Sequence, residues 1–156
     1  MPAPDLPPAP HRRARVLMAV HSAERAGAQL VALGQARALR REYDLVIAIG
    51  MGPLRAAFAQ VAVAVVRDAT CLPIWGAEHS RWALQIGRAI PDAVRFAALV
   101  RRNRIDVVVV NSTVLVSPVI GARLAGVPVI VHAQDCLLYT SPSPRDLSTS
   151  RMPSSA

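Results

Sequence analysis

Asp106-Val-Val-Val-Val-Asn111 is the stretch that decides the fold class of this chain. Four consecutive valines between two polar residues are typical of a strand buried on both faces of a sheet. A helix is predicted after it, over Pro118–Ala125, because Gly126 ends the pattern and a second apolar run, Val127–His132, follows. Two buried strands joined by a helix form a right-handed parallel unit, which indicates an α/β protein.

The same alternation extends toward the N-terminus. Further strands are predicted over Arg15–His21, Tyr43–Ile49 and Val61–Val66, and further helices over Gly27–Glu42, Leu54–Gln60 and His79–Asn103. Pro91 interrupts the last of these segments, which is expected to form two helices or one kinked helix. Together the elements predict a Rossmann-like, doubly wound parallel sheet of about five strands in the order 3-2-1-4-5.

The composition fits one such domain. The chain has 156 residues, of which 53% are hydrophobic but only 4% aromatic, so its core must be built from Val, Leu, Ile and Ala. The net charge is +8, and all 18 basic residues are arginine. With the many Ala, Val and Pro residues, this bias indicates a GC-rich genome more than a selected function. Nucleic acid is not an expected partner, because the sequence shows neither aromatic interleaving nor a recognised binding motif.

Cysteine usage and hydropathy predict the compartment. Cys71 is the only cysteine before Cys136, which fits a reducing compartment, and Met1–Pro10 lacks the apolar core of a signal peptide. No apolar run approaches the ~20 residues that span a bilayer. A cytoplasmic location is therefore expected. Arg95–Arg104 reads as the basic end of an amphipathic helix, which either packs on the core or lies on an anionic membrane at its inner face.

Three segments are expected along the chain. Residues 1–14 form a disordered Pro- and Arg-rich start, and residues 15–135 form the domain. Residues 136–156 are rich in Ser and Pro without any helical or strand period, which predicts disorder. This last segment also resembles an in-frame translation of a sequencing adaptor, and it is therefore interpreted as a non-native tail.

The candidate site lies at the carboxyl ends of the strands. In an open α/β sheet, ligands bind beyond these ends, near the switch point between the first and fourth strands. The candidate residues at these positions are His21, Ser22, Ala26, Gly27, Asn111, Ser112, His132 and Asp135. The four histidines show no metal-ligand spacing, so no metal is expected.

Each of these residues has a functional and a structural interpretation. His21 and His132 can hydrogen-bond a sugar hydroxyl or a phosphate, or act as a base near neutral pH, but a lone histidine is more often structural. Gly27 opens a helix whose free N–H groups attract an anion, or it merely eases a tight turn. Asn111 and Ser112 can donate to a phosphate or a sugar hydroxyl, but for Ser112 or its neighbour Thr113 a helix cap is favoured.

Two further features bear on the type of ligand. Asp135 is placed to orient His132. Gly50-Met-Gly52 has the start of a dinucleotide fingerprint, but Arg55 stands at its third glycine position and the motif follows the second strand, so a nicotinamide enzyme is not favoured.

Four segments in this order resemble the N-terminal domain of family 4 glycosyltransferases of the GT-B fold. They are Val20–Gln29, Gly52-Pro-Leu54, Arg104–Asn111 and Ala122–His132, and the resemblance covers about Arg15 to Asp135. It implies two Rossmann-like domains facing a cleft, of which this one shapes the acceptor side. It also implies a retaining transfer of sugar from a nucleotide-sugar donor to a glycan, lipid or small-molecule acceptor, without cofactor or essential metal.

The resemblance also implies roles for individual residues. The glycine-rich loop of the family maps to Ala26 and Gly27, and this chain departs from it with Ala26 for a glycine and Gln29 for a frequent glutamate. His132 matches a position near the reacting sugar and is the candidate catalytic residue. Most donor contacts of the family lie in a C-terminal domain, so the chain alone is expected to be inactive. The alternative is a stand-alone Rossmann-like domain for ligand binding or regulation.

Overall fold

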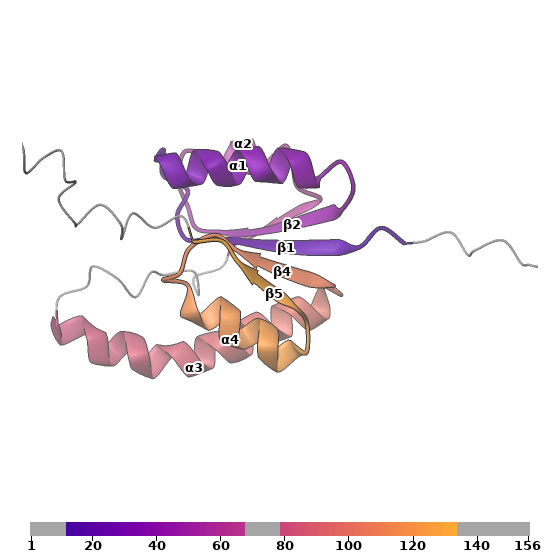
Figure 1. The fold of residues 1–156 in the computed structure, drawn as a ribbon. Helices are drawn as coiled ribbons and strands as arrows, with labels where there is room; N and C mark the ends of the chain where they lie inside the picture. The colour runs from indigo at the N-terminus through magenta and orange to yellow at the C-terminus, as the bar shows by residue number, and fades with distance from the viewer. Residues whose placement is uncertain (1–11, 68–78, 134–156) are drawn as a thin grey trace, which may run out of the picture.

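A five-stranded, all-parallel sheet with helices on both faces forms the molecule (Figure 1). The computed structural model describes residues 12–67 and 79–133. Its elements are β1 (Arg15–Val20), α1 (Gly27–Leu39), β2 (Asp44–Ile49), α2 (Arg55–Ala59), β3 (Ala64–Val66), α3 (His79–Arg102), β4 (Val107–Val110), α4 (Val116–Ala125) and β5 (Val129–Val131). The strand order is β3-β2-β1-β4-β5, which confirms the predicted fold class and order.

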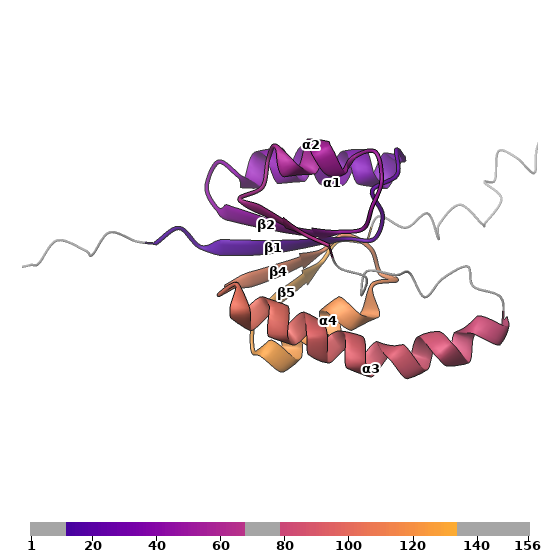
Figure 2. The same cartoon turned by 180° about the vertical axis from the view of Figure 1, so that it is seen from behind.

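The core lies in two layers, one on each face of the sheet. Helices α1 and α2 cover one face, and α3 and α4 cover the other (Figures 1 and 2). Because successive side chains of a strand point to opposite faces, Met18 of β1 packs in the first layer and Leu17 in the second. One fully buried aromatic ring stands in each layer, Phe58 in the first and Phe96 in the second.

Several helix limits differ from the predicted ones. α3 is one helix that contains Pro91, so of the two predicted forms the structure has the single helix. α4 begins at Val116, two residues before the predicted Pro118, and ends as predicted at Gly126, whose φ is +80°. Proline has no N–H to contribute to a ladder, and β5 begins only after Pro128, at Val129.

The two helices on the second face approach each other closely at Gly121. A Cβ atom on Gly121 would lie 2.6 Å from the carbonyl oxygen of Ala93 and 2.9 Å from the Cβ atom of Phe96. Only glycine therefore allows α4 to pack against α3 at this distance.

A hydrogen-bond cluster around Asp106 closes the amino edge of the sheet. The guanidinium of Arg12 donates to both carboxylate oxygens of Asp106, at 2.9 and 3.0 Å, and the backbone N–H of Arg15 donates to the second one at 2.7 Å. The guanidinium of Arg15 donates to the carbonyl of Asn103 at 2.9 Å. These contacts join the start of β1 to the start of β4, and they bring Arg12, from the predicted N-terminal segment, onto the domain.

Candidate functional site

The opposite, carboxyl edge of the sheet holds the residues predicted to form the site. His21 follows β1, Asn111 follows β4 and His132 follows β5. The backbone N–H of Asn111 donates to the carbonyl of Ala19 at 3.0 Å, and that of His132 donates to the carbonyl of Val110 at 2.8 Å. β1 and β4 are neighbours whose crossovers run in opposite directions, so His21 and Asn111 flank the topological switch point of the sheet.

His21 is held by the first turn of α1. The side-chain amide N–H of Gln29 donates to Nε2 of His21, with 2.9 Å between the nitrogens. Since Nε2 accepts, the proton of the neutral imidazole lies on Nδ1. Within the described residues, Nδ1 of His21 and Oε1 of Gln29 are buried without a hydrogen-bond partner. The pair therefore offers one N–H donor and one carbonyl acceptor.

Asn111 is the most unusual polar residue at this edge. Its side chain is 2% exposed, yet neither Oδ1 nor Nδ2 has a hydrogen-bond partner in the part of the chain that the structure describes. A buried amide in this condition costs about 1–3 kcal/mol, and most buried polar groups in native proteins avoid it. Such an amide is well suited to a ligand that both accepts and donates.

The N-terminus of α1 lies beside His21. Its N-cap residue, Ala26, makes no side-chain cap and the first turn carries no acidic residue, so its N–H groups and dipole suit an anion. A Cβ atom on Gly27 would meet nothing within 4 Å among the described residues, and the φ of Gly27 is not positive. The turn therefore does not require a glycine, and a ligand has room at this position.

A second loop closes against the first at Gly52. This residue has φ +154°, and a Cβ atom on it would lie 2.8 Å from Cβ of Ala23. The guanidinium of Arg55 donates to the carbonyls of Ile49, at 2.9 Å, and Gly50, at 3.3 Å, which places a cation at the end of β2. In the sequence, Arg55 stands out only as a departure from a glycine motif. The signal in the sequence that could have identified Arg55 is its position directly after the turn that follows a predicted strand.

Ser22 and Ser112 both close turns. The hydroxyl of Ser22 accepts from the N–H of Glu24 at 3.0 Å, and that of Ser112 accepts from the N–H of Val114 at 3.3 Å. The N-cap of α4 is Leu115, which makes no side-chain cap. The favoured interpretation of Ser112 as a helix cap was therefore wrong, because three residues of turn separate it from the helix.

His132 lies against a different part of α1 from His21. It is exposed, and its Nε2 accepts from the side-chain amide of Gln35 at 3.2 Å. Gln35 stands six residues after Gln29, which is about 9 Å along the helix axis. Asp135, predicted to orient His132, lies outside the described residues.

The described part of the chain contains neither a metal-binding cluster nor a membrane-spanning helix. No group of three His, Cys, Asp or Glu side chains in residues 12–67 and 79–133 could hold a metal ion. Over the same residues, no helix has the length and apolar character needed to cross a membrane.

Comparison with known proteins supports the fold only. No protein-family model and no curated protein matches this sequence. Among solved structures, the chain is similar to the C-terminal domain of a hydrogenase from Pyrococcus furiosus, with a TM-score of 0.50 and 13% sequence identity. The match covers 81% of this chain and 96% of that domain. At this identity the likeness concerns the Rossmann-like architecture and carries no function.

Proposed function

We propose that this chain is the N-terminal half of a retaining glycosyltransferase, which transfers sugar from a nucleotide-sugar to a glycan, lipid or small-molecule acceptor. The observation that carries the proposal is a set of buried polar atoms on His21, Gln29 and Asn111 that lack partners among the described residues. They flank the switch point of the sheet, where ligands of open α/β folds bind. The sequence resemblance to the GT-B family supplies the reaction class.

The chemistry of these atoms suits a sugar. Nδ1 of His21 donates, Oε1 of Gln29 accepts, and the amide of Asn111 does both, while each sugar hydroxyl both donates and accepts. A site of this kind discriminates strongly against ligands without hydroxyls, because its buried groups would stay unpaired. The N-terminus of α1 and the guanidinium of Arg55 complement the phosphate of a donor.

Two further parts of the proposal rest on the resemblance alone. His132 is proposed to lie near the reacting sugar, although in this chain its ring contacts Gln35. A second domain is proposed to supply most donor contacts, so the 156-residue chain is expected to bind but not to transfer sugar.

The alternative is a Rossmann-like domain that binds a polar ligand without catalysis. The observation that favours it is the type of the orphaned atoms at the switch point. They are hydrogen-bonding groups, and among the described residues no carboxylate is paired with His21, whose ring is held by the amide of Gln29. Such a set recognises a ligand equally well with or without a reaction.

Binding at the carboxyl edge is tested by NMR titration of the chain with a panel of nucleotide-sugars and with the matching free sugars. We expect amide shifts at residues 21–29 and 111–113. Asn111→Leu should abolish these shifts, whereas Asn103→Leu, which removes an amide that donates to the carbonyl of Leu99 at the amino edge, should leave them unchanged. The proposed site would be contradicted if the same amide shifts persisted in Asn111→Leu, or if no sugar ligand bound.

Catalysis is tested on a longer chain. The source gene should continue past residue 135, and its product should transfer sugar from the donor that this chain binds. A longer product that binds the donor but transfers nothing supports the alternative. Sugar transfer by the 156-residue chain itself would contradict the proposed division between two domains.

A further inference from the structure

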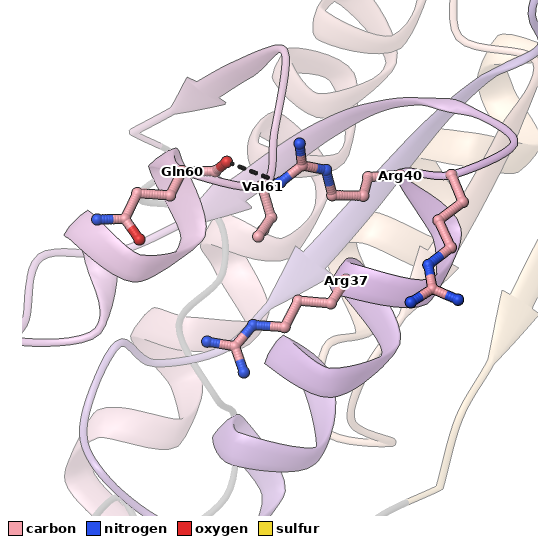
Figure 3. Close-up of a pocket in the computed structure, with 5 residues that line it drawn as sticks. Arg37, Arg40, Gln60 and Val61 are labelled. Atoms are coloured by element: carbon pink, nitrogen blue, oxygen red, sulfur yellow. Dashed lines mark hydrogen bonds between the residues drawn. The ribbon is translucent and has the colours of Figure 1, made fainter.

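A pocket at the amino edge of the sheet, away from the candidate site, is lined by arginines. Its volume is about 490 Å³, and its lining residues are Arg37, Arg40, Arg41, Gln60 and Val61 (Figure 3). The arginines come from the C-terminal end of α1, whereas Gln60 and Val61 follow α2. Both helices have reached the start of the next strand here, which places the pocket at the opposite end of the sheet from His21 and Asn111.

The described residues form no ion pair with the arginines of this pocket. The ion pairs in that part of the chain join Arg12 to Asp106 and Arg95 to Asp92. Arg37, Arg40 and Arg41 therefore form none with the carboxylates described. A smaller adjoining pocket of about 180 Å³ shares Arg40, Gln60 and Val61 and adds a fourth arginine, Arg13, together with one acid, Asp44. The guanidinium of Arg13 donates to the carbonyl of Arg41.

One arginine of the pocket is held by a hydrogen bond to the opposite wall. The guanidinium of Arg40 donates to the carbonyl of Gln60 at 3.2 Å, which connects the end of α1 to the end of α2 (Figure 3). A guanidinium has five N–H donors, so this bond orients the group and leaves other donors for a ligand. Arg37 extends from the preceding turn of α1 on the side of Gln60 and Val61 (Figure 3).

Stabilisation of the helix end explains only part of this arrangement. A cation in the last turn of α1 complements the helix dipole, and Arg37 alone supplies it. That role requires neither a hollow between two helices nor a bond from Arg40 to the next helix. Planar guanidinium groups that line a hollow are well suited to hold a phosphate, through paired charge-assisted hydrogen bonds.

We propose that Arg37, Arg40 and Arg41 bind a phosphate group in this pocket, with the rest of the ligand against Gln60 and Val61. The phosphate belongs either to a soluble ester or to a lipid headgroup, which present the same chemistry. The site does not depend on the proposed transferase activity, since it shares no residue with the carboxyl edge.

The test uses the whole chain in two arms. In the first, inorganic pyrophosphate is titrated and followed by NMR at residues 37–41 and 60–61, which separates this pocket from the N-terminus of α1 at residues 26–29. In the second, sedimentation is measured with phosphatidylcholine vesicles with and without phosphatidic acid. Each arm compares Arg37→Gln/Arg41→Gln, which keeps the Arg40 to Gln60 bond, with Arg102→Gln/Arg123→Gln, which removes the same charge from exposed positions on the other face.

The expected result is binding that weakens about tenfold or more in Arg37→Gln/Arg41→Gln and stays unchanged in Arg102→Gln/Arg123→Gln. If this pattern is found with pyrophosphate, the ligand is a soluble phosphate ester. If it is found only with vesicles that contain phosphatidic acid, the ligand is a lipid headgroup. Absence of binding in both arms, or equal weakening in the two variants, would overturn the proposal. Circular dichroism of each variant verifies that it is folded.

Discussion

Asp106 and Asn111 stand at the two ends of the same strand, β4, and their side chains are in opposite conditions. The carboxylate of Asp106 accepts hydrogen bonds from the guanidinium of Arg12 and the backbone of Arg15. The amide of Asn111 is more deeply buried, but neither of its polar atoms has a partner within the described chain. The difference teaches that one edge of the sheet uses a polar group for stability, whereas the other leaves a buried amide without a partner among the described residues.

The largest expected effect comes from Gly52→Ala, which would force apart the two loops that meet at the carboxyl edge. A Cβ atom would clash with Ala23 at 2.8 Å, and the φ of +154° strains any residue other than glycine. We expect a loss of about 3 kcal/mol in the free energy of unfolding, measured by urea titration. A loss below about 0.5 kcal/mol would show that the two loops separate easily and that the edge is not rigid.

Asp106→Ala tests the satisfied end of β4. It removes the bonds to Arg12 and Arg15, so we expect a loss of about 1–2 kcal/mol, since these partners are partly exposed. The control is Asp92→Ala, which removes an ion pair with Arg95 within one helix and should cost no more than about 0.5 kcal/mol. Equal losses in the two variants would remove the contrast between the edges.

Asn111→Leu tests the unsatisfied end of the same strand. Leucine has a similar size and no polar atom to leave unpaired, so we expect the ligand-free chain to gain about 1 kcal/mol in unfolding free energy. Binding at the carboxyl edge should be lost at the same time. A loss of stability instead would mean that the amide is hydrogen-bonded in solution, and the comparison with Asp106 would fail.

The smallest effect is expected from Gly27→Ala. The backbone there does not need glycine and the described residues leave room for a Cβ atom, so alanine should raise the unfolding free energy by about 0.5 kcal/mol. A clear destabilisation, seen in the same urea titration, would show that the start of α1 is more crowded than its described neighbours indicate.

The fold was largely predictable because its signals are local. Four valines in β4, the cations at the end of α1 and Gly126 after α4 each indicate an element by themselves, and the alternation of strands and helices leaves few topologies. Local rules compete at Pro91, where the sequence left two helices or one kinked helix open. The structure has a single helix, α3, that continues through this exposed proline.

The positions of the candidate residues in the sheet were predictable, but their contacts were not. The rule for parallel sheets selected His21 and Asn111 from the ends of β1 and β4. It missed Gln29 as the partner of His21, and it undervalued Arg55, because both act through contacts with another segment. The arginine pocket could not be predicted from the sequence for the same reason, since it exists only where the ends of α1 and α2 meet.

By itself the sequence determined the strands and helices, their order in the sheet and which residues stand at the carboxyl ends of the strands, since periodicity and βαβ handedness are properties of neighbouring residues. Only the tertiary structure decided which polar groups are satisfied. Whether Asp106 or Asn111 has a partner depends on segments far away along the chain, on burial and on distances of a few ångströms. Hydrogen bonds are short and directional, so no spacing in the sequence encodes them.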